Sequence, residues 1–147
     1  MDAVTITGGR TPWHLWLVGG LALLWNAFGA YDYLMTQTHN AAYLAQFTPE
    51  QRAYFASYPV WMVADWAIGV WGGLLGAILL LMKKRWAYPV FVVSLAAFLI
   101  SVFYTYALSN GAETMDAKGT IISVVIAVFG VIETVYAREM SRRGVLR

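Results

Sequence analysis

Four ionisable side chains stand inside long apolar stretches of this sequence: His14, Asp32, Asp65 and Glu133. A charge at the centre of a lipid bilayer costs at least ~2.5–3.5 kcal/mol on insertion scales, so residues of this kind are candidates for binding a ligand or a proton. A carboxyl group in a dry protein interior is a particular candidate for proton exchange. These residues therefore mark where chemistry is expected, if the apolar stretches are membrane spans.

Asp65 is the strongest of these candidates. It stands about five residues, or ~8 Å, into the second apolar stretch. It also shares helical spacing with Gly69 and Gly73, which directs it toward neighbouring helices. Asn26 in the first stretch is expected at a similar depth, and we predict a polar contact between Asn26 and Asp65. A structural hydrogen bond with no further role is the simpler interpretation of this contact.

His14 and Glu133 form a second predicted pair. His14 stands at the start of the first apolar stretch and Glu133 about one helical turn before the end of the last one, so both belong to the same membrane face. The alternatives are that Arg138 or residues 83–85 neutralise Glu133 locally, and that His14 is an interfacial residue. Asp32 lies near the opposite face and is interpreted as an interfacial polar residue.

Enzyme chemistry is not indicated by the sequence. Cys is absent, which excludes disulfides, thiolate metal sites and cysteine nucleophiles. The second histidine, His39, is expected on the opposite side of the membrane from His14, so the two cannot share a metal. Motifs of the P-loop, G-x-S-x-G and H-E-x-x-H types do not occur. We therefore expect no catalytic residues, no metal and no cofactor.

Four stretches of mostly apolar residues hold these side chains, at approximately 12–34, 60–82, 86–108 and 120–136. Such runs predict transmembrane helices, because lipid cannot hydrogen-bond an exposed backbone. Only 12% of the chain is charged, against about 25% in soluble domains. The sequence predicts one integral membrane domain, residues 1–147. Its fold class is an all-α, antiparallel bundle of four transmembrane helices with the lipid bilayer as its main partner.

The distribution of Lys and Arg predicts the orientation of this bundle. Cytoplasmic loops carry an excess of these residues, so both termini are expected in the cytoplasm. The three residues 83–85 are the whole predicted connection between the second and third spans, which makes these spans antiparallel neighbours. The basic tail, residues 141–147, is expected to meet anionic headgroups. A net charge of +2 does not suggest a nucleic-acid partner. Of the ten Lys and Arg residues, those on the predicted inner side are Arg10, Lys83, Lys84, Arg85, Arg138, Arg142, Arg143 and Arg147, and those outside are Arg52 and Lys118.

Two further features concern the ends and faces of the spans. Thr48, Pro49 and Gln51 have the spacing of a capping box with proline at the first helical position, which predicts one or two short external helices between spans one and two. Small residues at helical spacing are expected to bring the spans into close contact. The predicted packing residues are Gly19, Gly29, Gly69, Gly72, Gly73 and Gly76.

Several segments of the chain resemble a largely uncharacterised family of small four-span proteins from Gram-negative bacteria. They are residues 25–33 (WNAFGAYDY), 35–38 (MTQT), 47–51 (FTPEQ), 71–76 (WGGLLG) and 143–146 (RGVL). The resemblance covers most of the chain and implies a bacterial inner-membrane location. Some members of that family are loosely labelled sugar transporters, and the family offers no catalytic or binding residues to carry over.

Two functions are consistent with these features. In the first, the protein handles a small solute or a proton, as an oligomer, with Asp65 and Asn26 at an outer polar site and His14 and Glu133 at an inner one. In the second, it is an accessory or scaffold subunit that docks onto a larger membrane complex through its glycine faces. A hydrated cavity at the carboxylates would favour the first function, and a dry centre with an open small-residue face would favour the second.

Overall fold

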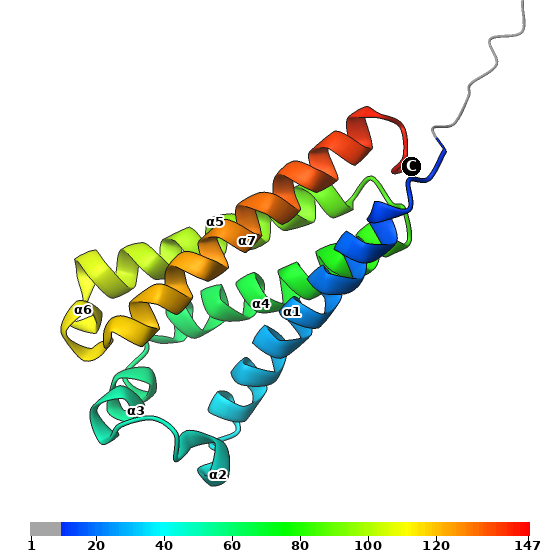
Figure 1. Ribbon diagram of the computed structural model, residues 1–147. Helices are drawn as coiled ribbons and strands as arrows, with labels where there is room; N and C mark the ends of the chain where they lie inside the picture. The colour runs from blue at the N-terminus through cyan, green and yellow to red at the C-terminus, as the bar shows by residue number, and fades with distance from the viewer. Residues whose placement is uncertain (1–9) are drawn as a thin grey trace, which may run out of the picture.

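The computed structural model describes residues 10–147, and the secondary structure of this part of the chain consists of helices, with no strand (Figure 1). The long helices lie lengthwise beside one another, and the short ones gather at one end, which we call the cap end (Figure 1). The predicted all-α fold class is confirmed. In chain order the elements are α1 (His14–Gln37), α2 (Ala41–Leu44), α3 (Pro49–Ala56), α4 (Val60–Leu81), α5 (Ala87–Phe103), the π-helical turn η1 (Tyr104–Leu108), α6 (Gly111–Thr114) and α7 (Ala117–Arg142).

Within residues 10–147, three helices are long and apolar enough to cross a membrane: α4, α5 together with η1, and α7. These are the helices of a membrane protein in length and composition. The predicted first span also forms a helix, α1, which has 24 residues and continues to Gln37. This helix is not one of the three, and it carries Asn26, Asp32 and several Trp and Tyr side chains.

Helices α4 and α5 form a tight hairpin. Lys83 takes a left-handed backbone conformation (φ 56°) in the turn that reverses the chain. Beyond the turn, the glycines of α4 lie against α5, since a Cβ at Gly72 would stand 3.3 Å from that of Ser94 and a Cβ at Gly76 would stand 2.8 Å from the ring of Phe91. Small residues thus let the two backbones approach closely, as they do in membrane helix pairs generally.

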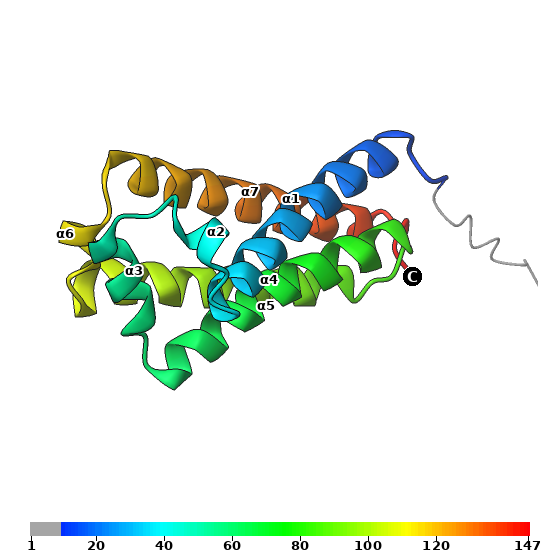
Figure 2. The same cartoon turned by 90° about the horizontal axis from the view of Figure 1, so that it is seen from below.

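Helix α1 crosses α4 obliquely, and another face of α1 approaches α7 (Figure 2). Gly19 of α1 lies against Leu81, and Gly29 lies against Val70. Asn26 lies between these two glycines and meets Gly73 of α4. The crossing places the middle of α1 against the middle of α4.

The cap end is built from α2, α3 and α6. Thr48 and Gln51 form the predicted capping box at the start of α3, with Pro49 in its first turn, so this prediction is confirmed. The Tyr54 hydroxyl lies 2.8 Å from the Ser109 hydroxyl, which fastens α3 to the segment after η1. The short helices are therefore docked on the ends of the long ones.

At the opposite end, which we call the basic end, the chain folds back after α7. Gly144 has a φ of 70°, and the N–H groups of Gly144 and Val145 donate to the carbonyls of Ser141 and Met140. Glycine takes the left-handed position of this Schellman turn without strain. It buries Val145 and Leu146 in the apolar core of that end.

The contact of the basic tail with lipid headgroups stays a prediction, and within this tail two apolar residues lie in the core. Val145 and Leu146 pack into the protein because their side chains complete a core that the helices alone leave open. Only the basic side chains of the tail remain at the surface. The other buried members of this core are Leu15, Ala22, Ala77, Leu80, Ala87, Phe91, Ala137 and Met140.

Candidate functional site

A buried carboxyl group lies where α1 meets α7. The Glu133 residue on α7 is only 6% exposed, and its Oε1 accepts a hydrogen bond of 2.8 Å from Nδ2 of Asn26 on α1. The same Nδ2 also donates to the carbonyl of Ala22, at 2.8 Å. The side-chain oxygen of Asn26 occupies the space that a side chain at Gly73 would fill. Gly73 therefore makes the room in which the amide reaches the carboxyl group.

Helices α1 and α7 are joined by side chains rather than by close backbones, in contrast to the pairs α4–α5, α1–α4 and α5–α7. Toward the cap end from Glu133, the Trp25 and Phe129 rings stack with their centroids 4.5 Å apart. Toward the basic end, Nδ1 of His14 lies 2.5 Å from the Tyr136 hydroxyl. We call these three contacts, Trp25–Phe129, Asn26–Glu133 and His14–Tyr136, the α1–α7 seam.

The predicted contact between Asn26 and Asp65 is wrong. Helix α1 extends to Gln37, so Asn26 lies 11 residues from its end and deeper in the bundle than the apolar pattern indicates. The oblique crossing then sets Asn26 against Gly73, two turns along α4 from Asp65. Asn26 instead donates a hydrogen bond to the carboxyl group of Glu133 on α7.

The predicted pairing of His14 with Glu133 is also wrong. The histidine contacts Tyr136, one turn further along α7, because the long tyrosine side chain reaches toward the start of α1. Nor do cations neutralise Glu133, since the ion pairs of residues 10–147 are confined to Glu139 with its neighbours Arg142 and Arg143. The carboxyl group of Glu133 thus has an amide as its hydrogen-bonding partner.

Asp65 lies on a different side of the bundle, inside the α4–α5 hairpin. The Ser101 hydroxyl donates a hydrogen bond of 2.8 Å to Oδ2 of Asp65. Unlike Glu133, Asp65 is partly exposed. The four residues of the predicted outer and inner sites thus lie in different contacts from those predicted: Asn26 with Glu133, His14 with Tyr136 and Asp65 with Ser101.

Asp32 ties the cap to α1. The Tyr43 hydroxyl of α2 donates a hydrogen bond to the Asp32 carboxylate. Burial raises the pKa of Tyr43, and the hydrogen bond to the neighbouring carboxylate raises it further, so the hydroxyl keeps its proton. Asp32 is thus a structural residue at the cap end, with a partner that the sequence interpretation did not name.

The chemical capacity of the seam follows from its composition. Among residues 10–147 no three His, Asp or Glu side chains are grouped to hold a metal ion. Every buried polar side-chain atom in the same range has a hydrogen-bonding partner. The seam therefore offers acid–base groups rather than metal ligands, and Asn26 holds the carboxyl group of Glu133 in place.

Comparison with protein-family models, curated proteins and solved structures finds no match for this chain.

Proposed function

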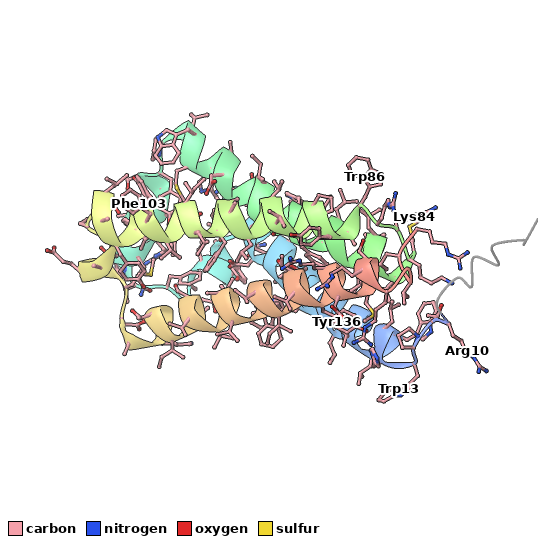
Figure 3. All side chains as sticks on the ribbon, turned by 90° about the horizontal axis from the view of Figure 1, so that it is seen from above. Arg10, Trp13, Lys84, Trp86, Phe103 and Tyr136 are labelled. Atoms are coloured by element: carbon pink, nitrogen blue, oxygen red, sulfur yellow. The ribbon has the colours of Figure 1, made fainter. Side chains whose placement is uncertain are left out.

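We propose that this chain is a multi-pass protein of a bacterial inner membrane that handles protons or a small solute, with Glu133 as its proton-exchanging group. In this proposal α1 supplies a fourth span beside α4, and the basic end faces the cytoplasm. The predicted orientation is supported by the segregation of basic residues, since Arg10 and Lys84 lie at one end of the molecule, far from Phe103 (Figure 3).

The observation that carries the proposal is the burial of Glu133 against an amide without a cation. A cation partner would hold the carboxylate in its charged form. An amide has both a donor and an acceptor, so Asn26 can hydrogen-bond the charged and the protonated carboxyl group alike. This pairing suits a group that changes its protonation state during a working cycle.

The rest of the seam suggests how the site would open. Trp25 and Phe129 close it toward the cap end, and His14 with Tyr136 forms a polar contact on the way to the basic end. Because α1 and α7 meet only through side chains, a small separation of these helices would expose Glu133 without breaking the α4–α5 hairpin. We place the moving joint of the cycle in this seam, and an oligomer would complete the solute path.

The test compares Glu133→Gln with Asp65→Asn in proteoliposomes. Glutamine keeps the shape and the hydrogen bond of Glu133 but cannot exchange a proton. We expect the Glu133→Gln variant to lose most of the proton flux measured with an entrapped pH-sensitive dye. Asp65→Asn is the matched control, because it removes a carboxyl group from outside the seam, and it should retain the flux. Equal flux in wild type and Glu133→Gln would refute the role of Glu133.

An accessory role in a larger complex is the second candidate. It is favoured by α7, which packs closely on α5 and leaves a wide apolar face uncovered, and by a seam in which every buried polar atom is paired. The glycines of α4 are already covered by α1 and α5, so docking would use α7 instead. Co-purification of a large complex in mild detergent, lost on placing a charge at Val128, would favour this role. The exposed apolar residues of α7 include Ile121, Ile122, Val124, Val128, Val131, Ile132 and Val135.

A further inference from the structure

A depression of about 260 Å³ opens at the basic end of the molecule. It lies where the residues after α7 meet the turn between α4 and α5. Three basic residues, one threonine and two apolar residues line it. They are Lys83, Lys84, Arg147, Thr11, Met82 and Val145.

Backbone hydrogen bonds bring Arg147 next to the turn between α4 and α5. The N–H of Arg147 donates to the carbonyl of Lys83 at 2.8 Å, and the N–H of Arg85 donates to the carbonyl of Arg147 at 3.0 Å. Burial of Val145 and Leu146 anchors the same segment in the core. Arg147 is thus held beside the α4–α5 turn by the fold, although side chains of like charge repel one another.

Within residues 10–147, no Asp or Glu side chain forms an ion pair with these cations. The ion pairs of this range join Glu139 to Arg142 and to Arg143, at 4.0 and 2.7 Å, and do not involve Lys83, Lys84 or Arg147. An anion in the depression would relieve the repulsion. Arg and Lys side chains with a nearby hydroxyl are the donors that bind phosphate groups.

We propose that this depression binds the phosphate headgroup of an anionic phospholipid. Its place at the end of the membrane-spanning helices favours a lipid over a free phosphate ion as the source of that group. Trp13 and Trp86 are exposed at this same end, as interfacial aromatic residues are (Figure 3). Met82 and Val145 offer apolar contacts next to the cations. The volume is below the roughly 300–1,000 Å³ of drug-sized pockets, as expected for a headgroup. This proposal does not depend on proton exchange at Glu133.

The test uses the full chain in neutral detergent and the double variant Lys84→Gln/Arg147→Gln. Lys83 is left unchanged because its left-handed backbone makes a substitution there ambiguous. The matched control, Arg52→Gln/Lys118→Gln, removes two cations from the cap end. Binding of dioleoyl phosphatidylglycerol and dioleoyl phosphatidylcholine is measured by native mass spectrometry, and thermal midpoints show that each variant is folded.

Wild type and control should bind phosphatidylglycerol in preference to phosphatidylcholine. The Lys84→Gln/Arg147→Gln variant should bind phosphatidylglycerol about tenfold more weakly or worse, since each basic residue contributes near an anionic surface. Unchanged binding by this variant would overturn the proposal, as would equal binding of the two lipids by wild type. Complete displacement of the lipid by millimolar inorganic phosphate would also overturn it, by identifying a free-anion site.

Discussion

The α4–α5 hairpin and the α1–α7 seam join helices in opposite ways. In the hairpin, glycines bring two backbones together, and a Cβ at Gly72 or Gly76 would crowd the facing helix. In the seam, the backbones stay apart and long side chains meet: a ring on a ring, an amide on a carboxyl group and a histidine on a tyrosine. In the proposed function, the hairpin is the rigid support and the seam is the joint that opens.

The difference follows from chain connection and residue size. Five residues link α4 to α5, and that short turn fixes both the direction and the register of the pair. Helix α1 is connected to α7 through the rest of the protein, so only contacts between side chains determine how these two helices meet. Small residues allow two helix backbones to come close together. Large polar side chains keep the backbones further apart and hydrogen-bond to particular partners.

The largest predicted effect lies in the hairpin, at Gly76. Replacement of Gly76 by alanine forces a methyl group against the buried ring of Phe91. We expect a loss of about 1–3 kcal/mol in the free energy of unfolding, the usual range for overpacking. Reversible unfolding in mixed micelles, followed by circular dichroism, measures this loss.

Gly20→Ala is the matched control, because nothing lies within 4 Å of a Cβ at Gly20. It should leave stability unchanged or raise it slightly, since alanine favours helix over glycine. Phe91→Leu should rescue part of the Gly76→Ala defect by making space. Equal stability of the two alanine variants would show that the hairpin is not closely packed at Gly76.

A smaller effect is expected in the seam, from the Asn26–Glu133 contact. A double-mutant cycle with Asn26→Ala and Glu133→Ala should give a coupling energy of about 0.6–1.7 kcal/mol, between the mean and the maximum measured for hydrogen bonds between membrane helices. Adding Gly73→Ala to wild type should mimic Asn26→Ala, because the new methyl group takes the place of the amide oxygen. Additive losses from Asn26→Ala and Glu133→Ala would mean that the contact does not hold α1 to α7.

The sequence was sufficient to predict the helical fold, the hairpin and the α3 capping box, because each depends on local pattern. It was also sufficient for a contact that we did not predict. Asp65 precedes Lys83 by 18 residues and Ser101 follows it by 18, and for Gly72 and Ser94 both separations are 11. In an antiparallel hairpin with a fixed turn, residues equally far from the turn lie opposite each other, so register alone identifies Ser101 as the partner of Asp65.

The seam could not be predicted in this way. No turn relates α1 to α7, and the depth of Asn26 depends on where α1 ends, which the apolar pattern placed three residues early. The crossing angle of α1 over α4 depends on how Gly19, Gly29 and Gly73 fit their neighbours, which is a property of the packed state. The burial of Val145 and Leu146 was not predicted for a related reason, since the basic residues around them made the tail look like a surface segment.

The smallest predicted effect concerns the polar contact inside the hairpin. Ser101→Ala removes the hydrogen bond to Asp65, and we expect a loss of about 0.6 kcal/mol or less in the free energy of unfolding. The loss is small because Asp65 is partly exposed and can exchange this partner for water, whereas Glu133 is buried. A double-mutant cycle with Asp65→Asn measures the coupling under the same conditions as the Asn26–Glu133 cycle. If the Asp65–Ser101 coupling energy were the larger of the two, the stronger polar contact would lie in the hairpin. The Asn26–Glu133 contact would then not be the main polar link between the helices.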